Sequence, residues 1–104
     1  MTLTMIYITT SSRDEALRIG RTVVGDRLAA CANVLPGVTS VYWWQGEVQE
    51  EGETSLILKT RSELVERLTR RVKELHTYDC PCVVALPIAG GNPDFLQWIA
   101  EETR

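Results

Sequence analysis

The residues of this 104-residue chain best suited to bind a metal are one histidine and three cysteines. The imidazole of His76 suits ions such as Cu(II) and Zn(II), whereas cysteine thiolates prefer soft ions such as Cu(I). Cys80 and Cys82 lie two residues apart, so in an extended segment they point to the same side. This pair either holds a soft metal with a third ligand or packs as small apolar side chains, and packing is favoured. Cys31, which follows two alanines, is expected to be a buried thiol rather than a nucleophile.

A second group of residues is suited to bind a small ligand. Lys59 falls on the opposite strand face from the leucines that flank it, where its ammonium group can meet an anion or pair with Asp79 or Glu47. The alternative is a solvated lysine at a strand end. Together with Lys59, we consider Tyr78 and Trp44 as ligand-binding candidates.

Composition argues against several classes of function. The chain has 11 Lys and Arg against 14 Asp and Glu, and its basic residues are scattered except for Arg67, Arg70, Arg71 and Lys73, which argues against nucleic-acid binding. Apolar runs such as residues 82–88 are far shorter than the roughly 20 residues of a membrane helix. Three cysteines without a secretory leader indicate reduced thiols. We therefore expect a cytoplasmic protein with no membrane or nucleic-acid partner and, since no set of acid, base and nucleophile is visible, no enzymatic activity.

The elements that must position these candidates follow from hydrophobic patterning. Residues 3–10 form an apolar, β-branched strand, and Ser12 with Glu15 predicts a capping box at the start of a helix. The residues after Asn33 are extended, with a break or bulge at Pro36-Gly37, a strand over residues 38–48, a turn around Glu51-Gly52 and a strand over residues 54–61. The first helix has an apolar stripe that comprises Ala16, Ile19, Gly20, Val23, Val24, Leu28 and Ala29.

The second half of the chain repeats the alternation of helix and strand. Ser62 and Glu63 open a second helix, residues 82–88 form a fourth strand, and Asn92-Pro93 caps a closing helix. The buried face of the second helix comprises Leu64, Leu68, Val72 and Leu75. We therefore predict one α+β domain over residues 1–104, of the ferredoxin-like split βαβ (βαββαβ) class, with an antiparallel sheet and an extra C-terminal helix.

Apolar residues on both faces of this sheet predict a partner subunit. In the first strand Met5 and Tyr7 lie on one face and Ile6 and Ile8 on the other, whereas a sheet with one solvated face alternates apolar and polar residues. Leaving about six such side chains exposed, at roughly 1.5–3 kcal/mol each, would cost as much as the whole stability of a small domain. An exposed patch that serves another ligand is the alternative.

Several segments resemble the CutA divalent-cation tolerance family. The strongest is DRLAACANVLPGVTSVYWWQG at residues 26–46, and further matches are LKT at 58–60, ALPI at 85–88 and GNPDFLQW at 91–98. His76, Tyr78 and Pro81 also fit the family pattern, and the resemblance covers about residues 5–100. It implies a ferredoxin-like homotrimer, similar in plan to the PII signalling proteins, and an association with tolerance of copper and other divalent cations.

The metal site that the resemblance implies is incomplete in this chain. Family members with proposed copper ligands have a cysteine in the first strand and a second histidine, whereas this chain has Thr9 and Leu75 at those positions. We therefore expect weak copper binding, with His76 and Cys31 as the metal ligands.

The resemblance and the candidate residues lead to two functional hypotheses. The first is a trimeric divalent-cation tolerance protein that binds copper or another divalent metal ion weakly and responds to it. The alternative is a PII-like trimer that holds a small anionic ligand in a cleft between subunits, near Lys59, His76 and Tyr78.

Overall fold

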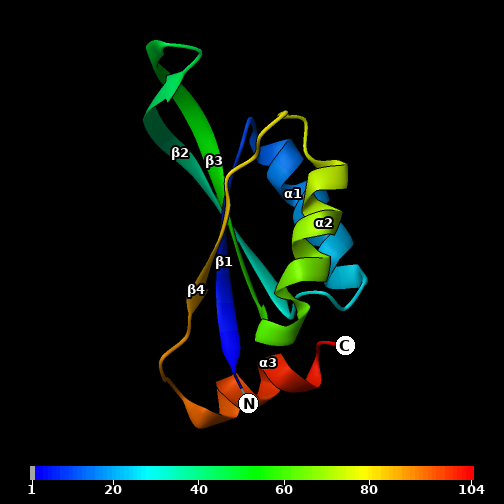
Figure 1. Ribbon diagram of the computed structural model, residues 1–104. Coiled ribbons are helices and arrows are strands. Elements are labelled where there is room, and N and C mark those ends of the chain that lie inside the picture. Colours follow the sequence, from blue (N-terminus) through cyan, green and yellow to red (C-terminus); the bar gives the residue numbers. More distant parts are fainter. Residues whose placement is uncertain (1) are drawn as a thin grey trace.

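The computed structural model describes residues 2–104, so Met1 of the predicted domain lies outside the described residues. Four strands form one antiparallel sheet in the order β2-β3-β1-β4, with α1 and α2 on one side and α3 at one end (Figure 1). The elements are β1 Leu3–Thr10, α1 Arg13–Gly25, β2 Cys31–Trp44, β3 Glu47–Arg61, a 3-10 turn Ser62–Leu64, α2 Val65–Leu75, β4 Val83–Pro87 and α3 Pro93–Glu101. This arrangement confirms the predicted ferredoxin-like α+β fold with an extra C-terminal helix.

Helix α1 ends earlier than its apolar stripe predicts. The prediction that Leu28 and Ala29 belong to the helix was wrong, because the helix ends at Gly25 and Arg27 adopts a left-handed φ of 63°. The Leu28 amide then donates back to the Val23 carbonyl at 3.0 Å, the hydrogen bond of a Schellman motif. Leu28 and Ala29 are nevertheless buried, since the turn directs the chain back onto the core.

Strands β2 and β3 continue beyond the rest of the sheet as a two-stranded ribbon (Figure 1). The pairing between β3 and β1 stops at Thr54, so residues 38–53 pair only within the hairpin. The predicted break at Pro36-Gly37 is confirmed as a β-bulge, at which Gly37 has a φ of 84°. The ribbon makes the molecule elongated, with extents of 44 × 24 × 22 Å.

The turn of this hairpin lies six residues before its predicted position. The prediction of a turn around Glu51-Gly52 was wrong, because Gly52 pairs with Thr39 inside the ladder. The chain reverses at Gln45 and Gly46, whose φ angles are 51° and 81°. Two successive left-handed residues match the twist of a two-residue hairpin, and a turn there allows the ladder to continue to the end of β2.

The positions of α2, β4 and α3 agree closely with the predicted ones. Helix α2 buries Leu68 and Val72, and β4 is one residue shorter at each end than predicted. At α3, Asn92 Oδ1 accepts the Asp94 amide at 3.0 Å and Pro93 is the first helical residue. None of the helices within residues 2–104 is long and apolar enough to span a membrane.

The two faces of the sheet are covered unequally. Helices α1 and α2 pack on one face, over Ile6, Ile8 and Leu56, all of which are fully buried. On the other face α3 covers only one end, where Ile99 packs with Leu3. The exposed large apolar side chains are Leu35, Val41, Tyr42, Trp43, Trp44, Val48, Val84, Leu86, Phe95 and Trp98.

Candidate functional site

Glu15 joins two distant segments at the N-terminus of α1. The Oγ atom of Ser12 accepts the Glu15 amide at 3.1 Å, which confirms the predicted helix start. Glu15 Oε1 accepts hydrogen bonds from the amide and the hydroxyl of Ser11 at 2.8 and 2.9 Å, and Oε2 accepts the Thr77 amide at 2.9 Å. One carboxylate thus ties the start of α1 to the loop that follows α2.

The environment of Glu15 keeps it ionised. Burial raises the pKa of Glu15, but hydrogen bonds from Thr77 and Ser11 outweigh burial and lower its pKa to about 2. The positive end of the α1 dipole also favours a negative charge at this position. The junction therefore holds a buried negative charge at neutral pH.

The ring of His76 is fully enclosed beside this carboxylate. Its Nδ1 atom accepts the Tyr78 amide at 3.1 Å, so Nε2 carries the proton and donates to the Thr9 carbonyl at 2.8 Å. Glu15 Oε2 lies 3.8 Å from Nδ1. Since both ring nitrogens are engaged, coordination of a metal by His76 would require one of these hydrogen bonds to break. The role of His76 as a ligand stays a prediction.

A groove of about 670 Å³ separates the hairpin ribbon from the loop between α2 and β4. Its hairpin wall includes Tyr42, Trp43, Trp44, Glu51 and Glu53, and its loop wall includes Tyr78, Asp79, Cys80 and Cys82. The structure therefore brings the predicted residues Trp44 and Tyr78 together. It also corrects the packing role favoured for Cys80 and Cys82, because both thiols are free and exposed.

A hydrogen bond across this groove keeps the Tyr78 hydroxyl protonated. Its hydroxyl donates to Glu53 Oε2 at 2.8 Å. Burial, followed by the hydrogen bond and the charge of Glu53, raises the pKa of Tyr78 well above its usual range. The pKa of Tyr42 is also raised, by burial and by the charge of Glu51. Both phenols therefore stay protonated at neutral pH, and the Tyr78 hydroxyl is the donor to Glu53.

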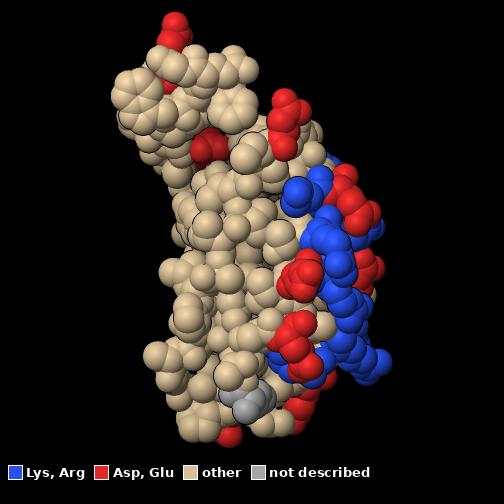
Figure 2. Space-filling view, in the orientation of Figure 1, with Lys and Arg blue, Asp and Glu red and all other residues tan. Residues whose placement is uncertain are grey.

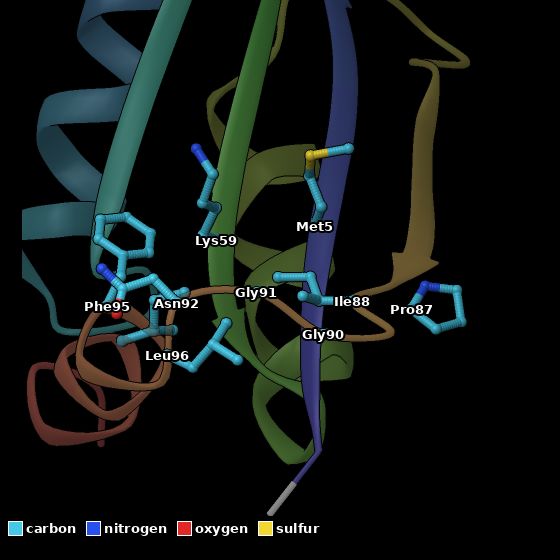
Figure 3. Close-up of a pocket in the computed structure, with 10 residues that line it drawn as sticks. Met5, Lys59, Pro87, Ile88, Gly90, Gly91, Asn92, Phe95 and Leu96 are labelled. Carbon is cyan, nitrogen blue, oxygen red and sulfur yellow. The ribbon is translucent and has the colours of Figure 1, made fainter.

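Lys59 lies elsewhere, on the sheet face that α1 and α2 leave open (Figure 3). Its Nζ atom donates to Asn33 Oδ1 at 2.6 Å and lies 3.9 Å from Cys31 Sγ. Lys59 thus pairs with an amide rather than with Asp79 or Glu47, its predicted carboxylate partners. A cavity of about 490 Å³ beside α3 includes Lys59 in its lining, and Cys31 is half-buried.

The strand register separates the predicted site residues into two groups. Lys59 and Cys31 pair with each other across β3 and β2, and Lys59 pairs with Met5 on β1. His76 binds Thr9, four residues farther along β1, and four strand residues span roughly 13 Å. Within one chain, the predicted metal ligands His76 and Cys31 are therefore not brought together. Lys59 is likewise remote from the other two predicted ligand-binding residues.

The charge of the groove is one-sided. Glu51, Glu53 and Asp79 line it, and no Lys or Arg of the described residues 2–104 contributes to its lining. Figure 2 shows the basic side chains over the side of the molecule that α1 and α2 form, with acidic and uncharged residues toward the hairpin. Among residues 2–104, no three His, Cys, Asp or Glu side chains converge closely enough to hold a metal ion. The groove thus offers negative charge without a preformed metal centre.

Sequence reasoning missed the contribution of Glu53 and part of that of Glu15. Glu53 was placed just after a turn, so its position in the ladder and its contact with Tyr78 were not visible. Glu15 was recognised as a cap residue, but its bond to Thr77 joins positions 62 residues apart, for which local sequence carries no signal.

Comparison with known proteins identifies close relatives. The family model described as CutA1 divalent ion tolerance protein matches residues 4–102. Protein CutA 1, chloroplastic, of Oryza sativa subsp. japonica is 45% identical over 100 residues, or 96% of this chain. The divalent-cation tolerance protein CutA of Thermus thermophilus is 48% identical over 99 residues, covering 95% of this chain and 96% of that protein.

Solved structures match equally well. The divalent cation tolerance protein from Thermus thermophilus superposes with a TM-score of 0.95 at 46% identity, covering 98% of this chain and 99% of that chain. The plant relatives are longer, since this chain spans 56% of the rice protein and 55% of a chloroplastic CutA of Arabidopsis thaliana.

Proposed function

Because this chain belongs to the CutA1 divalent ion tolerance family, we propose that it acts in tolerance of divalent cations, as a homotrimer that binds such cations weakly in the groove between the hairpin and the α2–β4 loop. The observation that carries the metal part is the charge of this groove. Three carboxylates line it, and among residues 2–104 no Lys or Arg belongs to its lining.

The chemistry of the groove suits divalent cations at low affinity. Carboxylate oxygens are ligands for hard divalent ions, and imidazole and thiolate groups extend the range to Cu and Zn. Glu53 already accepts the Tyr78 hydroxyl, and no set of three donors converges within the described part of the chain. A cation entering the groove must therefore reorganise side chains, which lowers its affinity.

The trimer part of the proposal is supported by apolar surface that one chain leaves uncovered. Trp43, Val41 and Val48 on the ribbon are 74, 64 and 56% exposed, and Val84 and Leu86 on β4 are 48 and 42% exposed. A two-stranded ribbon is marginally stable in water unless its side chains pack on something. Further copies of this chain would cover the ribbon and the open sheet face together, at roughly 1.5–3 kcal/mol for each large side chain fully buried.

Titration calorimetry tests the metal part. We expect Mn(II), Zn(II) and Cu(II) to bind the wild type weakly and to lose their binding heat in the double variant Glu51→Gln/Asp79→Asn. Glu66→Gln is the matched control, because this α2 carboxylate is 89% exposed and lies outside the groove lining. Equal binding by the double variant and the wild type would reject the groove as the site.

Light scattering tests the assembly. Three chains of 11.7 kDa predict a particle of about 35 kDa under closed symmetry. Trp43→Ala should shift the protein toward smaller species at low concentration, whereas the same change at Trp98, on α3, should do so less. A wild-type protein that stays monomeric at micromolar concentration would contradict the trimer.

The anionic-ligand alternative has less support from the groove. Its one cationic candidate, Lys59, lies with Asn33 beside the second cavity, away from Tyr78 and Trp44. An anion in the groove would instead face the three carboxylates.

A further inference from the structure

The groove carries a second set of donors, whose chemistry differs from that of the carboxylates. Cys80 and Cys82 are free, exposed thiols that flank Pro81, and both line the groove. We propose that these two thiols form a two-coordinate site for copper(I), one ion per chain. The inference goes beyond the proposed function, because it assigns a soft monovalent ion to a different donor set in the same groove.

The short Cys80-Pro81-Cys82 segment keeps the two thiols near enough for one ion to bridge them after side-chain rotation. Proline fixes its own φ near −65° and keeps the preceding residue extended, so Cys80-Pro81-Cys82 is a stiff segment. Two extended residues span roughly 6.6 Å, and thiolate–metal bonds of about 2.3 Å require sulfurs within about 4.6 Å of each other. Since both side chains are exposed, rotation about χ1 can close this difference without displacing the core.

The chemistry selects a soft monovalent ion. Thiolates favour Cu(I), whereas the neighbouring carboxylates favour harder ions and do not compete for it. Binding releases two thiol protons and forms two S–Cu bonds, and the two thiolates with one Cu(I) leave one negative charge. No electron is transferred when copper is supplied as Cu(I). Two donors complete the site, so the absence of a three-residue donor cluster among residues 2–104 does not oppose it.

The third cysteine provides a matched control within the same chain. Cys31 is half-buried, and its sulfur lies 3.9 Å from Lys59 Nζ on the open sheet face. It is absent from the groove lining and has no neighbouring cysteine. A general affinity of thiols for copper would involve Cys31 as well, whereas the proposed site would not.

The test is an anaerobic titration of the full assembled chain with Cu(I), in the presence of reductant and a competing Cu(I) chelator. We expect one Cu(I) per chain in the wild type and in Cys31→Ser. Cys80→Ser and Cys82→Ser should each lose this stoichiometric binding while keeping the wild-type circular dichroism spectrum. Trp43 and Trp44 line the same groove and provide a fluorescence signal for occupancy.

Two results would overturn the thiol site: stoichiometric Cu(I) binding by the double variant Cys80→Ser/Cys82→Ser, or its loss in Cys31→Ser. A parallel titration with Mn(II), which carboxylates prefer, separates this failure from a failure of the proposed function. If Mn(II) binding is lost without Glu51 and Asp79, while Cu(I) binds the serine variants as it binds the wild type, only the thiol site is rejected. If Cu(I) behaves as expected and no divalent ion binds, the proposed divalent function is rejected and the copper(I) site stands.

Discussion

Replacement of Glu15 by glutamine removes the buried charge at the junction of α1 and the α2–β4 loop while keeping the size of the side chain. The carboxylate accepts three hydrogen bonds, two from Ser11 and one from the Thr77 amide. Glutamine has a single acceptor oxygen, so its NH₂ group must face a donor at one of these partners. We expect Glu15→Gln to fold into the same arrangement with lower stability.

The pKa of Glu15 gives the size and the pH range of this effect. The difference between the ordinary pKa of 4.5 and about 2, at ~1.4 kcal/mol per pH unit, corresponds to roughly 3–4 kcal/mol. Because the folded-state pKa is lowered, this stabilisation is complete above about pH 4.5 and is lost as the pH falls through about 2. The difference in unfolding free energy between wild type and variant should therefore be roughly 3–4 kcal/mol at pH 7 and close to zero near pH 2.

Urea unfolding followed by circular dichroism measures this difference. Wild type and variant are compared at pH 7, 5, 3 and 2 at one protomer concentration, because the stability of an oligomer depends on concentration. Glu66→Gln is the control, since an exposed carboxylate of a surface ion pair should change stability by less than about 0.5 kcal/mol. The reasoning is refuted if Glu15→Gln matches the wild type at pH 7, or if its destabilisation is the same at pH 7 and pH 2.

Three further changes test other parts of the fold, each by urea unfolding. Ser12→Ala should cost about 1 kcal/mol, because it removes the cap of α1, and Ser12→Gly should cost less; equal costs would argue against the cap bond. Gly46→Ala should cost about 1–2 kcal/mol, since Gly46 has a φ of 81°, whereas Gly52→Ala, inside the ladder with open space around it, should cost less. Tyr78→Phe should cost about 1 kcal/mol by removing the bond to Glu53, and an unchanged unfolding midpoint would mean that the bond contributes nothing.

Local signals in the sequence predicted the elements well and two of their ends poorly. The caps at Ser12 and Asn92 were predicted because each residue bonds an amide two or three positions away. The hairpin turn was misplaced because Gln45 carries no turn signal, while Gly52 has one but lies in a strand. Leu28 is buried as predicted but lies outside the helix. The left-handed Arg27 turns the chain back, so Leu28 reaches the core from the loop that follows α1.

The candidate site depended on contacts that the sequence does not contain. The pattern of residue types identified His76, Tyr78 and Trp44 as candidates, and the resemblance placed them in a family. Only the fold showed that both nitrogens of His76 are already hydrogen-bonded and that Tyr78 and Trp44 line one groove.

What the sequence by itself determined is the order of strands and helices, the apolar character of both sheet faces and the family to which the chain belongs. The elements and the sheet faces follow from periodicity, capping and composition, which act over a few residues, whereas the family follows from the resemblance of segments such as residues 26–46. The tertiary structure alone decided which donors meet, because the partner of Glu15 is 62 residues away and that of His76 is 67 residues away. It separated Lys59 and Cys31 from His76 and exposed Cys80 and Cys82 to the groove, since sheet register and loop path set these distances.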